Sequence, residues 1–335
     1  MSLLTVSGSP HIHSDQPVPK IMYGVVIAMI PAMLVSFYFF GLGAAKVMLT
    51  SILACLFFEW VIQKYLLRGP LTINDGSALV TGVLLAFNVP SSLPVWMTIT
   101  GAFVAIAVAK MSFGGLGQNP FNPALVGRVF LLMSFPVQMT LWPVPKPLFG
   151  GTAVTDAITG PTTLGIVKEG LNAGKTVSEL LPEIPGYASE LLGNQGGSLG
   201  EVSAIALLLG AAYMFYKKII TWHIPVAYTL SVVIFSGIFW LINPERYLDP
   251  LFHLVTGGMI LGIFYMATDM VSSPINGRGM LIFGAGCGIL TMIIRLWGGY
   301  PEGVSFAILI MNAFAPLINR SVKPRRFGVV KAVKS

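Results

Sequence analysis

The chain has 335 residues, of which 55% are hydrophobic and only 10% are Asp, Glu, Lys or Arg. Because soluble domains carry roughly a quarter charged residues, this composition excludes a water-soluble globular protein and indicates one polytopic membrane unit. The net charge of +7 does not indicate nucleic-acid binding, because most basic residues lie at the ends of apolar stretches, where they set membrane orientation.

A polar leader over residues 1–20 precedes the first apolar stretch. The leader lacks the apolar centre of a cleavable signal, so we expect the first stretch to be a retained helix. Apolar stretches of near-spanning length then recur along the chain, and each is a predicted membrane span. The ten stretches are 21–40, 44–63, 77–90, 93–111, 124–141, 202–216, 222–242, 251–268, 279–297 and 303–319.

Ten spans place both termini on one side of the membrane, and the basic residues indicate which side. Most Lys and Arg residues fall on the terminal side, including the cluster that begins at Arg320, which predicts that this side is cytoplasmic. Residues 142–201 then form a loop in the outer compartment. Residues 320–335 form a basic cytoplasmic tail that contacts anionic lipid.

A short internal repeat divides the spans into two sets of five. Leu79-Val80-Thr81-Gly82, near the start of the third span, recurs as Leu254-Val255-Thr256-Gly257 near the start of the eighth. Because five is odd, two such halves must cross the membrane in opposite senses, which is the inverted-repeat design of many transporters. We therefore predict an all-α fold with repeats at 21–141 and 202–319 and a cavity between them.

Several familiar signatures are absent. The stretch from Gly170 to Thr176 is one residue too short for a P-loop, which argues against ATP-driven transport by this chain. Gly284 and Gly288 lie within an apolar span, so close helix packing explains them better than a dinucleotide site. The His residues are dispersed along the chain, which argues against a metal centre. Cys55 and Cys287 lie inside predicted spans, which argues against a disulfide framework.

Two acidic residues lie in or beside the spans, Glu59 late in the second and Asp269 just after the eighth. A charge in the bilayer is costly unless it is paired or hydrated, so both residues are candidates to bind or relay a cation. The simpler interpretation is an interfacial position or an ion pair with an arginine. The arginines considered as partners are Arg68, Arg128 and Arg278.

The outer loop contains Asp156-Ala157-Ile158-Thr159-Gly160-Pro161-Thr162-Thr163. Taken alone, this stretch is typical of a turn, because Thr, Gly and Pro all favour one. It also resembles the Asp-x-x-Ser/Thr-Gly-Ala-Thr flavinylation motif of the family that contains RnfD and NqrB, with Pro161 where Ala is more frequent. A second stretch, Asn122-Pro123-Ala124-x-x-Gly127-Arg128, resembles the Asn-Pro-Ala-x-x-Gly-Arg sequence that the family carries before its fifth span.

The resemblance implies a cofactor and its place of attachment. In that family the last Thr of the motif carries FMN through a phosphoester, which a separate flavin transferase installs. The resemblance therefore assigns FMN to Thr162, with Asp156, Thr159 and Gly160 forming the motif around it and Thr163 as the alternative attachment site. The flavin supplies the redox chemistry, so no catalytic side chain is expected.

A second, non-covalent flavin such as riboflavin is a further expectation on the cytoplasmic side. Asn119 and Asn122 offer amides that can hydrogen-bond the edge of an isoalloxazine, and Phe121 offers a ring that can stack on it. Turns and helix caps explain the same residues almost as well.

The resemblance implies one subunit of a redox-driven ion-translocating complex in the bacterial cytoplasmic (inner) membrane, inactive alone. A leader of only about twenty residues favours the RnfD type, in a ferredoxin:NAD oxidoreductase (Rnf) complex, over the NqrB type, in a sodium-pumping NADH:quinone oxidoreductase. Implied partners are the other Rnf subunits, including a second flavinylated subunit and iron–sulfur subunits, and the flavin transferase. The coupling ion, sodium or proton, stays open. A cofactor-free small-solute channel and a structural scaffold are the alternatives from other classes.

Overall fold

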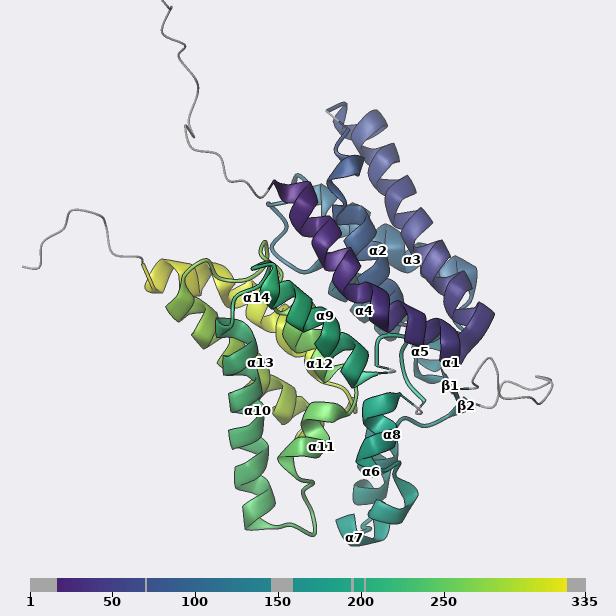
Figure 1. Cartoon of the computed structure of the whole chain (residues 1–335), viewed down its shortest axis with the longest axis vertical. Coiled ribbons are helices and arrows are strands. Elements are labelled where there is room, and N and C mark those ends of the chain that lie inside the picture. The colour runs from purple at the N-terminus through teal and green to yellow at the C-terminus, as the bar shows by residue number, and fades with distance from the viewer. Residues whose placement is uncertain (1–16, 70, 146–158, 194–195, 202, 324–335) are drawn as a thin grey trace, which may run out of the picture.

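The computed structural model describes residues 17–69, 71–145, 159–193, 196–201 and 203–323. These residues are mostly helical, and the one sheet among them pairs two short antiparallel strands, β1 (Trp142–Pro143) and β2 (Thr159–Gly160). Figure 1 shows the first helices, in purple and blue, gathered in one group and the last helices, in green and yellow, in another. The predicted all-helical fold is confirmed.

The first group begins with α1 (Val18–Val61), which joins the first two predicted spans and is broken at Gly41, where φ is 56° and ψ is −135°. Glycine adopts this backbone conformation without the steric penalty that a side chain would add. The remaining elements of the group are η1 (Ile62–Leu67), η2 (Ile73–Asp75), α2 (Ser77–Phe87), α3 (Val95–Phe103), η3 (Val104–Val108), η4 (Met111–Phe113), α4 (Pro123–Ser134) and α5 (Pro136–Thr140).

The second group contains an interruption that the apolar pattern does not predict. The expected span at 251–268 consists of α11 (Pro250–Val255), α12 (Met259–Leu261) and η6 (Gly262–Met266), with Gly257 at φ 69° between the first two. Because apolar composition is uniform across the break, hydropathy cannot reveal it. The other helices of this group are α9 (Ala204–Tyr216), α10 (His223–Ile242), α13 (Gly277–Trp297) and α14 (Val304–Ser321).

The described residues of the segment predicted as a loop at 142–201 include four short helices. They are α6 (Thr163–Asn172), α7 (Val177–Leu180), η5 (Leu181–Glu183) and α8 (Tyr187–Leu192). Leu164 and Val167 of α6 pack with Leu248 and Phe252 in a small hydrophobic cluster of their own. In Figure 1 these short helices lie at the end of the molecule opposite the start of α1 and the end of α14.

Small residues allow α10 and α13 to pack closely, as predicted from sequence. A Cβ atom on Gly284 would lie 2.7 Å from the Ile224 carbonyl oxygen, and one on Gly288 would lie 2.7 Å from the Tyr228 carbonyl oxygen. Both contacts are shorter than van der Waals packing permits. Close packing of this kind is typical of membrane helices.

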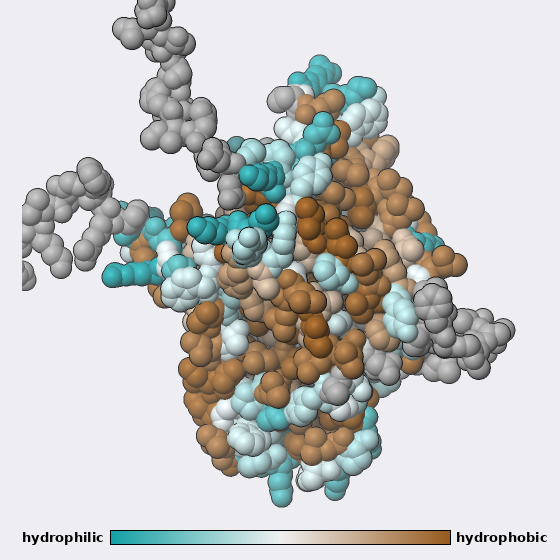
Figure 2. Space-filling model, in the orientation of Figure 1, coloured by the Kyte–Doolittle hydropathy of each residue, from teal (hydrophilic) through white to brown (hydrophobic). Residues whose placement is uncertain are grey.

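Much of the face drawn in Figure 2 is apolar, as its brown areas show. Within the described residues, five stretches are long and apolar enough to cross a membrane by length and composition. These are Val18–Leu67, Val95–Phe113, His223–Ile242, Gly277–Trp297 and Val304–Ser321. The chain is therefore a multi-pass membrane protein.

Candidate functional site

Thr162, the predicted attachment residue, is the N-cap of α6. Its backbone is extended, with φ −70° and ψ 159°, and its Oγ1 accepts a hydrogen bond from the Gly165 N–H at 3.1 Å. The side chain is half-buried, whereas Thr163 is 5% exposed and donates from its hydroxyl to Glu190 Oε1 at 2.6 Å. Of the two neighbouring threonines, Thr162 is thus the more accessible. Asp156 lies outside the described residues.

Thr162 lines a cavity of about 520 Å³, which we call the outer cavity. The strand pair positions the motif beside it, because Gly160 of β2 pairs with Trp142 of β1. Aromatic rings supply flat walls, and the rings of Tyr300 and Phe306 stack with centroids 5.3 Å apart. The other lining residues are Arg128, Leu132, Met139, Thr140, Trp142, Pro301, Glu302 and Ser305.

Arg128 connects the two helix groups at the wall of the outer cavity. Its guanidinium donates to the carboxylate of Glu302 and to the hydroxyl of Ser305. The other carboxylate oxygen of Glu302 accepts from the Gly258 N–H at 3.2 Å, in the interruption between α11 and α12. A buried arginine paired in this way fixes α4 against α14.

A second carboxyl group, that of Glu201, lies beside this pair and hydrogen-bonds Glu302. Burial and the neighbouring Glu302 carboxylate raise the pKa of Glu201 well above its usual value, while the Ser198 hydroxyl donates to Glu201 Oε1 at 2.7 Å. For Glu302 burial acts in the same direction, but Arg128 outweighs it and lowers the pKa to about 2. Of the two carboxyl groups, Glu201 therefore holds a proton more strongly than Glu302.

Arg295 compensates for the break in the eighth apolar stretch. Its guanidinium donates to the carbonyl oxygens of His253 at 2.7 Å and Thr256 at 2.9 Å, which the interruption leaves without helical partners. Unpaired backbone groups in a protein interior are costly, so a buried cation at this point stabilises the break.

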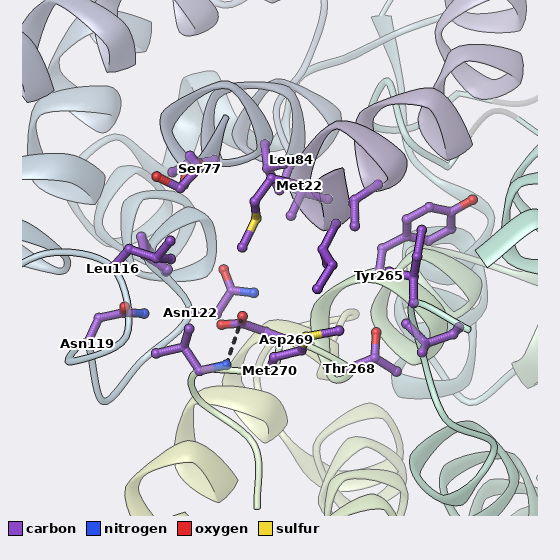
Figure 3. Close-up of a pocket in the computed structure, with 18 of the residues that line it drawn as sticks. Met22, Ser77, Leu84, Leu116, Asn119, Asn122, Tyr265, Thr268, Asp269 and Met270 are labelled. Carbon is purple, nitrogen blue, oxygen red and sulfur yellow. Dashed lines mark hydrogen bonds between the residues drawn. The ribbon is translucent and has the colours of Figure 1, made fainter. Parts of the chain in front are cut away.

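A second, inner cavity of about 740 Å³ lies between the two helix groups on the side away from α6. Figure 3 shows the polar side chains around it, with Asn119 and Asn122 from the first group and Asp269 from the second. Asn122 Oδ1 caps α4 by accepting from the Ala124 N–H at 3.1 Å, and its Nδ2 donates to the Met266 carbonyl oxygen at 3.3 Å.

Asn119 is the lining residue with an unused hydrogen-bonding group. Its Nδ2 donates to the Phe121 carbonyl oxygen at 3.0 Å, but its buried Oδ1 has no partner in the described part of the chain. Buried polar atoms are nearly always paired, so an N–H of a ligand is the natural partner for this oxygen. The side chain of Phe121 is half-buried and does not line the inner cavity.

Glu59 and Asp269 both lie at or near the inner cavity but in different surroundings. Glu59 accepts from Lys110 Nζ at 2.7 Å and from Gln63 Nε2 at 3.2 Å, so its partner is a lysine and not one of the arginines considered above. Asp269 accepts from the Ser272 hydroxyl at 2.7 Å, and burial raises its pKa.

Sequence reasoning missed the roles of Lys110, Glu201 and Glu302. The place of Lys110 at the end of an apolar stretch indicates a surface anchor for topology, yet only 1% of it is exposed. A signal was present: Lys110 lies shortly before a Gly-Gly pair at Gly114, as Arg295 does before Gly298. Both of these cations are buried in the structure.

Comparisons with known proteins agree along almost the whole chain. The model of the NQR2, RnfD, RnfE family matches residues 5–328. One subunit of the Na(+)-translocating ferredoxin:NAD(+) oxidoreductase complex of Acetobacterium woodii is 46% identical, over 99% of this chain and 97% of that protein. A subunit of the proton-translocating ferredoxin:NAD(+) oxidoreductase complex of Clostridium ljungdahlii is 44% identical, over 98% and 97%. A subunit of the ion-translocating oxidoreductase complex of Halorhodospira halophila is 37% identical, over 95% and 94%.

Proposed function

We propose that this chain, which belongs to the NQR2, RnfD, RnfE family and is a subunit of a redox enzyme complex, relays electrons through FMN esterified to Thr162. In this proposal the complex is an ion-translocating ferredoxin:NAD oxidoreductase. The observation that carries the proposal is the position of Thr162, whose hydroxyl caps α6 and lines the outer cavity.

The residues of the outer cavity fit an esterified flavin phosphate. The first N–H groups of a helix and the helix dipole favour an anion at its N-terminus, which is where Thr162 lies. Trp142, Tyr300 and Phe306 offer flat apolar faces for a ring system in the same cavity, and the guanidinium of Arg128 is held at its wall by the carboxylate of Glu302. FMN supplies the electron-transfer chemistry when bound, while these side chains position it and exclude water.

Thr163 is the poorer attachment site. Its hydroxyl donates to Glu190, so esterification would remove a donor from a buried carboxylate. Thr162 loses only an N-cap hydrogen bond, and a phosphoester oxygen at the same place can accept it instead.

We further propose that the inner cavity binds a second, non-covalent flavin such as riboflavin. The unpartnered Asn119 Oδ1 supports this assignment, because the pyrimidine edge of an isoalloxazine carries an N–H that can donate to it. Asn122 lines the same cavity, but its side chain already caps α4. It therefore stabilises the cavity wall and does not hydrogen-bond the flavin ring.

The proposed topology has ten crossings in two inverted repeats, with both termini in the cytoplasm and α6–α8 outside. Support comes from the break at Gly41, which separates two crossings within α1, and from the position of α6–α8 opposite the ends of α1 and α14 in Figure 1. In this arrangement α2, α4 and α9 cross as short helices within the protein interior.

The proposed transport path for a monovalent cation, sodium or proton, passes the inner cavity. Asp269 lines it, and Glu59 lies one contact away through Lys110, which also lines it. Relatives named for sodium and for proton translocation are both similar to this chain, which is consistent with either ion. The proposed partners are other Rnf subunits, including a second flavinylated subunit and iron–sulfur subunits, and a flavin transferase, in the bacterial cytoplasmic membrane.

The test is expression of the complex together with a flavin transferase, followed by denaturing electrophoresis under ultraviolet light. We expect a fluorescent band for the wild-type chain and for Thr163→Val, and a dark band for Thr162→Val. A dark wild-type band would support a cofactor-free channel instead. Unchanged ferredoxin-dependent NAD reduction by vesicles that contain Thr162→Val would support a structural scaffold.

A further inference from the structure

A third cavity, of about 700 Å³, lies between α6 and the ends of α10 and α13, and none of the functions above uses it. Its ionisable lining is basic: Lys168, Arg246, Arg295 and the imidazole of His253 face it, and no Asp or Glu is among the described residues that do. A concave site lined by one sign of charge concentrates counter-ions. We call it the basic cavity; its charge selects an anion.

The three cations contribute to the basic cavity to different degrees. Arg295 lies close to Glu302 and donates to backbone carbonyls, so its charge and its N–H groups are largely used. Lys168 donates to the Tyr300 carbonyl oxygen at 2.7 Å, and burial lowers its pKa. Arg246 is exposed, and among the described residues its guanidinium contacts the ring of Tyr247. The guanidinium is therefore available to a ligand.

His253 gives a second, independent indication of a ligand. The residue is 5% exposed and lines the basic cavity, yet neither ring nitrogen has a hydrogen-bond partner in the described part of the chain. Buried polar atoms of native proteins are nearly always paired. A neutral imidazole keeps one N–H to donate, and an anionic oxygen within the cavity would accept it.

The depth and the walls of the basic cavity indicate the kind of anion. Arg246 lies four residues beyond the last residue of α10, Ile242, and Trp297 is the last residue of α13, so the cavity lies near the ends of two spans. Aromatic residues at span ends are typical of the level of lipid headgroups. Leu248, Phe252 and Trp297 add apolar walls beside the basic groups.

We propose that the basic cavity binds the phosphate headgroup of an anionic phospholipid, with Arg246 and His253 contacting the phosphate and the apolar walls contacting the glycerol and upper acyl chains. Assignment to the outer leaflet rests on the proposed topology. Because α6, whose N-cap is Thr162, contributes Leu164 and Lys168 to the cavity, the lipid would hold this helix against α11 and α13.

The test titrates the detergent-purified complex with phosphatidylglycerol and counts bound lipids by native mass spectrometry. Parallel titrations use phosphatidylcholine and the soluble headgroup analogue glycerol 3-phosphate. We expect one tightly held phosphatidylglycerol, bound about tenfold more weakly in Arg246→Gln and in His253→Phe, because each variant removes a hydrogen bond to a charged phosphate.

Lys217→Gln is the matched control. Lys217 lies 5.7 Å from the ring centre of Tyr216, much as Arg246 lies 5.9 Å from that of Tyr247, but Lys217 does not line the basic cavity. Equal binding of phosphatidylcholine, no loss in Arg246→Gln, or an equal loss in Lys217→Gln would overturn the proposal. If glycerol 3-phosphate competes at the same concentration as the lipid, the ligand of the basic cavity is a soluble phosphate compound and not a lipid. Flavin fluorescence of the same samples reports separately on Thr162.

Discussion

Lys110 Nζ lies 2.7 Å from Glu59 Oε2, and the two side chains are 2% and 1% exposed. The same ammonium group donates to the Ser77 hydroxyl at 2.6 Å, at the first residue of α2. One buried cation therefore ties together α1, α2 and the segment that follows η3, beside the inner cavity.

Removing one member of this pair should be strongly destabilising, because the other charge stays buried without a partner. We expect Glu59→Gln and Lys110→Met each to lower the free energy of unfolding by about 3–5 kcal/mol. The double variant should lose much less than the sum of the two. Thermal unfolding of the purified protein in detergent measures the four members of the cycle, and simple additivity would contradict the pairing.

Glu201→Gln should change stability very little near pH 5 and should raise it relative to the wild type at pH 8. Burial and Glu302 raise the pKa of Glu201 in the folded protein, so ionisation is disfavoured there. The wild type then loses stability as the pH rises above the unfolded pKa of about 4.3, and the neutral glutamine lacks this loss. Unfolding midpoints at the two pH values decide, and parallel pH profiles for the two proteins would refute the assignment of the proton.

Glu302→Gln should lower the stability of the protein at neutral pH, whereas Glu201→Gln should raise it at pH 8. The change leaves the buried Arg128 without its carboxylate, and we expect a loss of about 3–5 kcal/mol at pH 7. Because the pKa of Glu302 is lowered to about 2, its contribution is present above the unfolded pKa and disappears as the pH falls toward 2. The gap between variant and wild type should therefore narrow in acid, and a constant gap from pH 7 to pH 3 would count against the ion pair.

Asn119→Ala should lower the content of non-covalent flavin about tenfold and leave covalent flavin unchanged, because the Asn119 acceptor faces the inner cavity. Flavin released by acid precipitation of the complex, compared with flavin that remains on the protein, gives the two amounts separately. Gln118→Ala is the control, since Gln118 is the adjacent exposed amide. Retention of all releasable flavin in Asn119→Ala would remove Asn119 from the site.

Hydropathy located the long apolar helices, because their composition sets them apart from the polar connections, but it did not predict α6–α8 within the segment expected to be a loop. It could not reveal the break at Gly257, since Gly and Thr fit an apolar stretch whether or not the helix continues through them. The stretch that resembles a flavinylation motif is visible in the sequence. The hydrogen bond from Thr163 to Glu190 and the capping of α6 by Thr162 depend on tertiary structure. The pairings of Lys110 with Glu59 and of Arg128 with Glu302 join positions far apart in the chain, which one sequence does not relate.

The grip of Arg295 on the carbonyls of His253 and Thr256 limits how this region can rearrange. Straightening α11 and α12 into one continuous helix would remove both acceptors from the guanidinium and leave a buried cation with fewer hydrogen bonds. These hydrogen bonds therefore fix the bend, and α11 and the end of α13 should move together as one rigid unit during turnover.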